Sequence, residues 1–264
     1  MAEVVNDGVR ISYDVRGSGR PLVLLNGWGC DRTWWDEAGF TRLLEPGFRL
    51  LNIDLRGHGQ SDKPHQPSAY RAEHHMKDVL AVADAEGADR FAIWGLSYGG
   101  WVGWLTADSM PGRVAALVSS GYWSPFPGSE QEWREFDATV GEALRRHGTR
   151  GLIDLYREAD GDAYEREYPP WAEAATLRAD PQALLAAEGP EVDQGITTPL
   201  DRFPVPVLLT AGEREDEQDQ ARAIASQLPQ GQSIRLSAMG HGAACAASEL
   251  LVPQARAFLD RCFN

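Results

Sequence analysis

The stretch FAIWGLSYGG at residues 91–100 decides the fold that we predict for this chain. Its first four residues are apolar, as in a buried strand, and a helical pattern runs from residue 98 onwards. Between the two lies Ser97, with Gly95 and Gly99 two positions away on either side. A serine at a sharp strand-to-helix turn exposes its hydroxyl oxygen, and only small residues fit at those flanking positions. The stretch therefore predicts a nucleophilic serine on a strained turn.

Short apolar runs alternate with helical patterns on both sides of this stretch. The predicted strands span residues 9–15, 21–25, 48–53, 91–95, 114–118, 205–210 and 233–236. The predicted helices span residues 70–86, 98–109, 218–228 and 248–262. Such alternation is typical of an α/β fold with a mostly parallel sheet that is flanked by helices on both faces.

Residues 123–202 interrupt this alternation. They contain helical segments divided by proline and glycine, and no convincing strand pattern. The segment holds 17 acidic and 8 basic residues, so −9 of the chain's net charge of −14 lies within it. We expect a helical lid over residues 123–202, inserted into an α/β core formed by residues 1–122 and 203–264.

Composition limits the classes of function. A chain of 264 residues that is 43% hydrophobic suits one large α/β domain. The strong negative charge repels phosphate groups, so we expect neither nucleic acid nor a membrane as a partner. No signal-peptide pattern or membrane-length apolar run is visible, which favours a cytoplasmic protein. The three cysteines lack metal-ligand spacing, so we expect no metal and no disulfide framework. We also expect no cofactor.

Further motifs accompany the serine turn in a fixed order. They are LNGWG at residues 25–29 with Trp34-Trp35 after it, DLRGHGQSDKP at residues 54–64, and GHG at residues 240–242. Together they resemble the α/β-hydrolase superfamily, and within it the lidded esterase, lactonase and cofactor-free haloperoxidase-like group. The motifs span nearly the whole chain. The resemblance implies the α/β-hydrolase fold, although that fold hosts many activities.

The resemblance also implies a catalytic triad in the chain order serine, acid, histidine. Ser97 is the nucleophile, and His241 follows the last predicted strand, where the family places its base. The family's acid usually stands three residues after the glycine that here is Gly212. That position is Glu215, and Asp216 is the second choice. Glutamate is acceptable because the fold uses either acid.

The loop after residue 25 corresponds to the family's oxyanion loop. The resemblance implies that the backbone N–H groups of Trp28 and Tyr98 stabilise the oxyanion. Asn26 stands where the family usually has histidine, and it must then supply the hydrogen bonds that brace the loop. We also expect Asn26 and Trp123 at the substrate pocket, because they flank the oxyanion loop and the entry to the lid.

These features predict a serine hydrolase that cleaves a small apolar or aromatic ester or lactone through an acyl-enzyme on Ser97. The acidic lid disfavours strongly anionic substrates. Epoxide hydrolases and haloalkane dehalogenases need a carboxylate nucleophile. Because residue 97 is serine, we do not expect either of these activities. Two alternatives stay open: hydrolysis of a C–C, thioester or amide bond by the same triad, and a non-catalytic small-molecule receptor on this scaffold. We expect a monomer or homodimer with a small-molecule substrate.

Overall fold

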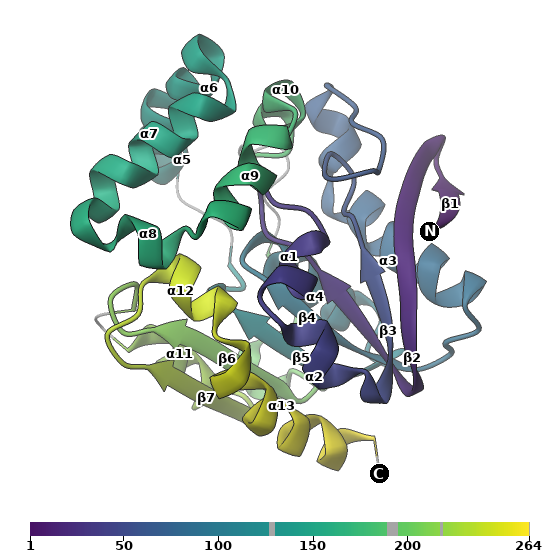
Figure 1. Ribbon diagram of the computed structural model, residues 1–264. Helices are drawn as coiled ribbons and strands as arrows, with labels where there is room; N and C mark the ends of the chain where they lie inside the picture. The colour runs from purple at the N-terminus through teal and green to yellow at the C-terminus, as the bar shows by residue number, and fades with distance from the viewer. Residues whose placement is uncertain (127–129, 189–194, 217–218, 264) are drawn as a thin grey trace.

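The computed structural model describes residues 1–126, 130–188, 195–216 and 219–263. Its centre is a seven-stranded sheet in the order β1-β2-β4-β5-β6-β7, with β3 paired to β2 (Figure 1). Strand β1 pairs with β2 in antiparallel orientation, and the other described pairs are parallel. The strands are β1 (Ala2–Asn6), β2 (Val9–Leu25), β3 (Pro46–Ile53), β4 (Phe91–Leu96), β5 (Val114–Ser120), β6 (Val207–Gly212) and β7 (Gly231–Leu236).

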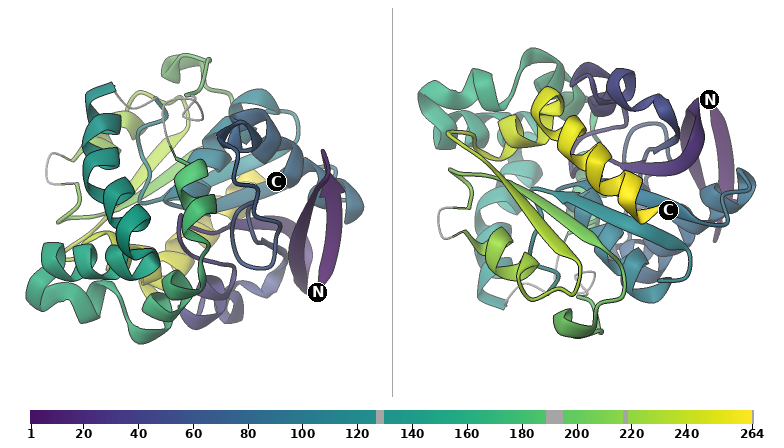
Figure 2. Two further views of the ribbon diagram at one scale, coloured as in Figure 1. Left: turned by 90° about the horizontal axis from the view of Figure 1, so that it is seen from above. Right: turned by 90° about the horizontal axis from the view of Figure 1, so that it is seen from below.

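Helices cover both faces of the sheet because its central strands are apolar on both sides. On β4, Phe91 and Ile93 belong to one buried cluster, and Ala92 and Trp94 belong to another. The first cluster includes side chains of α3 (Ala72–Ala85), α4 (Tyr98–Ser109) and α11 (Gln220–Ala225). The second includes side chains of α1 (Thr33–Glu37), α2 (Phe40–Leu44) and α13 (Ser248–Cys262). Helix α13 crosses one face of the sheet in the view from below (Figure 2).

The predicted α/β-hydrolase fold class is confirmed, and the differences lie in details of single elements. Helices α4 and α13 have the predicted bounds. The predicted strands at 9–15 and 21–25 are two parts of one long strand, β2. Gly17 and Gly19 lie within this strand at positive φ, and a Cβ added to either would collide with a backbone oxygen of β3. Strand β1 and helix α12 (His241–Ala246) were not predicted.

Helices occupy the segment between β5 and β6. We call α5 to α10 the lid helices; they lie together above the sheet in the view of Figure 1. They are α5 (Glu130–Phe136), α6 (Glu142–His147), α7 (Thr149–Asp160), α8 (Tyr164–Glu167), α9 (Pro170–Arg178) and α10 (Pro181–Ala186). Short helical turns span Pro67–Tyr70, Asp137–Gly141, Gly161–Ala163 and Leu200–Arg202. Within the described part of residues 123–202 no strand occurs, and the lid boundaries at 123 and 202 stay a prediction.

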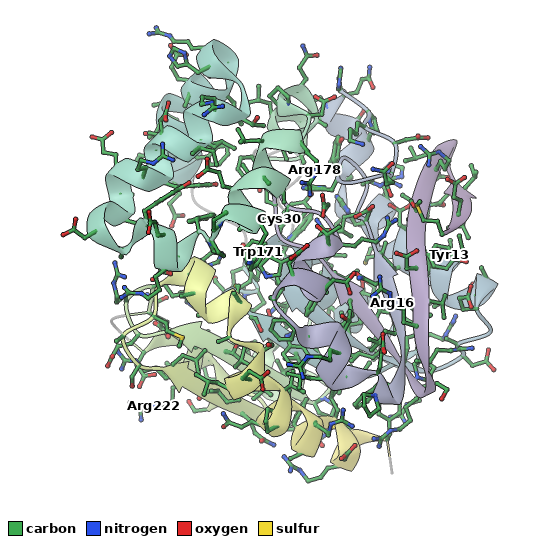
Figure 3. The ribbon with its side chains drawn as sticks, in the orientation of Figure 1. Tyr13, Arg16, Cys30, Trp171, Arg178 and Arg222 are labelled. Carbon is green, nitrogen blue, oxygen red and sulfur yellow. The ribbon has the colours of Figure 1, made fainter. Side chains whose placement is uncertain are left out.

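Specific contacts fasten the lid helices to the core. The indole of Trp28 donates a hydrogen bond to the carbonyl of Leu184 at 3.2 Å. Arg178 forms an ion pair with Asp31 at 2.9 Å. Figure 3 shows Arg178, Cys30 and Trp171 near the junction of the lid helices with the core. In the described residues, no helix is both long enough and apolar enough to cross a membrane.

Candidate active site

Ser97 lies on a strained turn between β4 and α4. Its backbone has φ 50° and ψ −114°, a conformation that costs a non-glycine residue about 1–3 kcal/mol. The neighbouring glycines make the turn possible. A Cβ at Gly95 would collide with the carbonyl of Gly99, and a Cβ at Gly99 would collide with the carbonyl of Leu25. The Ser97 amide also donates to the carbonyl of Ser120 at 2.7 Å, which ties the turn to the end of β5.

The imidazole of His241 is hydrogen-bonded to Glu215. Nδ1 of His241 lies 2.6 Å from Oε2 of Glu215, whose side chain is 9% exposed. The other carboxylate oxygen of Glu215 accepts from the backbone N–H of Gly212 at 2.7 Å, so the carboxylate is fixed from both sides. An acid in this position holds the ring with Nε2 turned away from it. The structure thus places the first-choice acid, Glu215, against the predicted base.

Asp216 has a different role in the structure. It is 2% exposed, and its side chain accepts from the backbone N–H groups of Gln220 at 2.6 Å and Ala221 at 2.9 Å. These are the first two residues of α11, whose N–H groups have no partner within the helix. Asp216 therefore caps a helix and is not engaged with His241.

The end of β5 brings the serine and the histidine to one place. Ser120 accepts the Ser97 amide, and a Cβ added to Gly121 would lie 2.7 Å from Cε1 of His241. Gly121 has φ +68°, so glycine provides both the backbone conformation and the space for the imidazole. Ser97 and His241 consequently line the same cavity.

The loop after β2 lies beside Ser97. A Cβ added to Gly27 would lie 3.7 Å from the Cβ of Ser97. Asn26 is fully buried; its amide group donates to the carbonyls of Gly27 at 2.9 Å and Cys30 at 3.1 Å. Its oxygen accepts from the backbone N–H of Leu55 at 3.0 Å. Asn26 therefore braces the loop that carries Trp28, as expected for the residue that replaces the family's histidine.

The cavity at Ser97 has a volume of about 320 Å³ and mixed apolar and acidic walls. Its lining residues are Gly27, Trp28, Cys30, Trp34, Leu96, Ser97, Tyr156, Asp160, Glu167, Tyr168, Thr176, His241, Gly242 and Cys245. Two expected pocket residues are absent from this lining. Asn26 is buried beneath the loop, and Trp123 packs against the core cluster that contains α3 and α4. Their role at a substrate pocket stays a prediction, because proximity in sequence to a motif does not set the direction of a side chain.

Several lining residues were not predicted from the sequence, and they come from the lid helices. Tyr156 and Tyr168 stack with ring centroids 4.7 Å apart. Asp160 and Glu167 add two carboxylates to the cavity. No sequence motif marks these residues. The high acidic charge of the lid is the only sequence signal that bears on Asp160 and Glu167. In the described residues no group of three or more histidine, cysteine or carboxylate side chains could hold a metal ion.

The acidic surroundings change the proton affinity of His241. Its enclosure in the cavity lowers its pKa, but the hydrogen bond and charge of Glu215 act in the opposite direction and prevail. Glu167 and Asp160 add further negative charge. The net result is a pKa of His241 above its ordinary value of 6.5.

Comparison with known proteins identifies the family. The model of the alpha/beta hydrolase family matches residues 22–253, which is most of the chain. This chain therefore belongs to the alpha/beta hydrolase family, and the predicted family is confirmed.

Individual relatives show how far the similarity extends. A pimeloyl-[acyl-carrier protein] methyl ester esterase of Vibrio campbellii is 35% identical over 127 residues, which cover 47% of this chain and 45% of the relative. Epoxide hydrolase 4 of Mus musculus is 28% identical over 116 residues, covering 44% and 32% respectively. The matched stretches thus span less than half the length of these two relatives. A solved thermophilic esterase from Thermogutta terrifontis has the same fold, with a TM-score of 0.82, 21% identity and complete coverage of both chains.

Proposed function

We propose that this protein is a serine hydrolase that cleaves small apolar or aromatic esters or lactones through an acyl-enzyme on Ser97. One observation carries the proposal: the His241–Glu215 hydrogen bond of 2.6 Å lies at the same cavity as a serine in a strained turn. A serine hydroxyl needs such an oriented base to become a nucleophile. The name of the Vibrio campbellii relative, a methyl ester esterase, supports an ester as the substrate class.

The proposed reaction has two steps. Oγ of Ser97 attacks the carbonyl carbon while Nε2 of His241 accepts its proton, and Glu215 stabilises the imidazolium that forms. The backbone N–H groups of Trp28 and Tyr98 donate to the oxyanion of the tetrahedral intermediate. The intermediate then expels the alkoxide, which takes the proton from His241. In the second step His241 deprotonates a water molecule that attacks the acyl-enzyme. The resulting tetrahedral intermediate expels Oγ of Ser97, which takes the proton back from His241, and the acid leaves.

The cavity supports the choice of substrate class. Its volume of about 320 Å³ is at the lower end of the range for small-molecule sites, and aromatic rings form much of its wall. The carboxylates of Asp160 and Glu167 disfavour an anionic group inside it. Small neutral substrates therefore fit the cavity best.

A panel of esters and lactones tests this function. We expect turnover of p-nitrophenyl acetate and of short apolar or aromatic esters and lactones, with a decrease as the acyl chain outgrows the cavity. A serine-directed fluorophosphonate should label the protein once, at Ser97, as determined by peptide mass spectrometry. Binding of these compounds without a burst or turnover would favour the receptor alternative, whereas turnover of only a thioester or amide would change the substrate class.

The raised pKa of His241 predicts the pH dependence of turnover. The base must be neutral to accept the serine proton, so kcat/KM should fall as the pH drops through the pKa of His241 in the free enzyme. Because this pKa lies above 6.5, the midpoint of the acidic limb should also lie above pH 6.5. The profile is measured with a substrate whose leaving group does not titrate in this range. A midpoint below 6.5 would contradict the arrangement of charges around His241.

A further inference from the structure

Glu167 is a carboxylate of the lid helices that is buried against the turn that carries His241. It is the last residue of α8, and its side chain is 1% exposed. A carboxylate is rarely buried to this degree unless several groups satisfy it. The proposed reaction assigns it no role, although it lines the same cavity as Ser97 and His241.

The two oxygens of Glu167 bind the backbone on both sides of His241. Oε1 accepts from the N–H of Gly240 at 3.0 Å, and Oε2 accepts from the N–H of Ala243 at 2.9 Å. Both N–H groups belong to the start of α12, where helical N–H groups lack partners within the helix. A single side chain from the lid helices therefore fixes the backbone from residue 240 to residue 243.

The two glycines beside His241 provide the space that this contact requires. A Cβ added to Gly240 would lie 2.8 Å from Oε2 of Glu167. A Cβ added to Gly242 would collide with the backbone carbonyl of Glu167. The Gly-His-Gly sequence thus allows close approach of α8 from the lid helices. The contact joins residues more than 70 positions apart in the chain.

Arg214 links the same carboxylate to the acid loop. Its Nη1 lies 3.1 Å from Oε1 of Glu167, and it directly precedes Glu215 in sequence. Three carboxylates from the surrounding elements raise the pKa of His241: Glu215 after β6, Glu167 on α8 and Asp160 on α7. Arg214 pairs with Glu167 and Asp160, and Cys245 on α12 lines the same cavity. Among these, Glu167 both holds the histidine turn and carries a charge that favours the imidazolium.

We propose that Glu167 is a positioning residue for His241, which clamps the turn at residues 240–243 to the lid helices and so presents the imidazole to Ser97. This inference rests on the proposed function of His241 as the base. It links the lid helices to the catalytic histidine. A displacement of α8 would break the two hydrogen bonds that Glu167 accepts beside His241, so full activity requires α8 to stay in contact with the core.

The substitution Glu167→Gln tests the proposal, with Glu165→Gln as the matched control. Glu165 lies on the same helix and is exposed, so both variants lose one negative charge from α8. In Glu167→Gln an amide N–H₂ replaces one acceptor and faces a backbone or guanidinium N–H. Because a displacement of about 1 Å can cost about 100-fold in rate, we expect kcat to fall about 10- to 100-fold with little change in KM. The acidic limb of kcat/KM should move to lower pH. Glu165→Gln should leave both kcat and the acidic limb unchanged.

Histidine titration by NMR provides a readout that does not require turnover. The His241 signal is assigned in histidine-labelled protein by its loss in His241→Gln, and its midpoint should decrease in Glu167→Gln but not in Glu165→Gln. Unchanged kcat and an unchanged midpoint in folded Glu167→Gln would overturn the proposal. If that variant does not fold, Glu167→Asp with Glu165→Asp decides: the shorter carboxylate cannot bridge both N–H groups, so equal kcat values for this pair would overturn it.

Failure of the proposed function has a different signature. A wild-type protein that neither turns over esters nor reacts with the fluorophosphonate would contradict the assignment of Ser97 and His241 as nucleophile and base. The NMR midpoints of wild type, Glu167→Gln and Glu165→Gln would still report whether Glu167 controls the environment of His241.

Discussion

Ester turnover by the Ser97→Ala variant should be at least about 10⁴-fold lower than that of the wild type. The reason is that alanine removes the atom that forms the acyl-enzyme, while the oxyanion donors and the cavity alone support only weak catalysis. The methyl group fits where the hydroxymethyl group was, so the fold should persist. The measurement is kcat with p-nitrophenyl acetate, together with a thermal unfolding curve of each protein.

Ser124→Ala is a suitable control for this experiment. Ser124 is exposed and lies between β5 and the first lid helix. Its substitution also removes one serine hydroxyl group, but away from the strained turn. It should retain wild-type turnover and fluorophosphonate labelling. If Ser97→Ala retained turnover close to that of the wild type, the nucleophile would be another residue and the proposed reaction would be wrong.

The two adjacent acids, Glu215 and Asp216, should respond in opposite ways to conversion into amides. Glu215→Gln should lower kcat by about 10⁴-fold, because an amide facing Nδ1 of His241 favours the wrong tautomer and cannot stabilise the imidazolium. Unfolding stability should change little compared with this loss. The measurements are kcat at a pH above the acidic limb and urea unfolding of the same preparation.

Asp216→Asn is the matched comparison. Asp216 uses both oxygens to accept from the first N–H groups of α11, and asparagine retains only one acceptor. Because one buried N–H group then loses its acceptor, we expect a loss of about 1–3 kcal/mol in the free energy of unfolding, with kcat within about threefold of the wild type. The opposite result, loss of turnover in Asp216→Asn and retention in Glu215→Gln, would exchange the two assignments.

The elements that were predicted correctly have strong local signals. Helix α4 directly follows the serine turn, and helix α13 has an apolar stripe that faces the sheet. The strands β4 and β5 are continuous apolar runs. Helix α12 was missed because it is short and begins at a histidine between two glycines, which is a poor helix signal. Strand β2 was predicted as two strands because residues 16–20, RGSGR, contain no apolar side chain that would continue the pattern.

The site residues likewise differ in whether a local motif or the packing of the fold determines their position. Ser97 and His241 were predicted because each lies in a glycine-rich motif at a strand end, and the structure places both at one cavity because the parallel sheet brings such ends together. Asn26 and Trp123 were placed in the pocket because of their positions beside motifs. The direction of each side chain was decided by packing: Asn26 turns inward to three backbone groups, and Trp123 packs against the core.

The sequence by itself determined the family, the position of the serine turn and the histidine that follows the last strand, because these depend on local backbone conformation and chain order. Only the tertiary structure distinguished Glu215 from Asp216, since adjacent side chains at a strand end point in different directions and the choice depends on what each one meets. Only the tertiary structure placed Glu167 at the histidine turn. That contact joins two helices distant in sequence, and no local pattern specifies how a helix of the lid packs against the core.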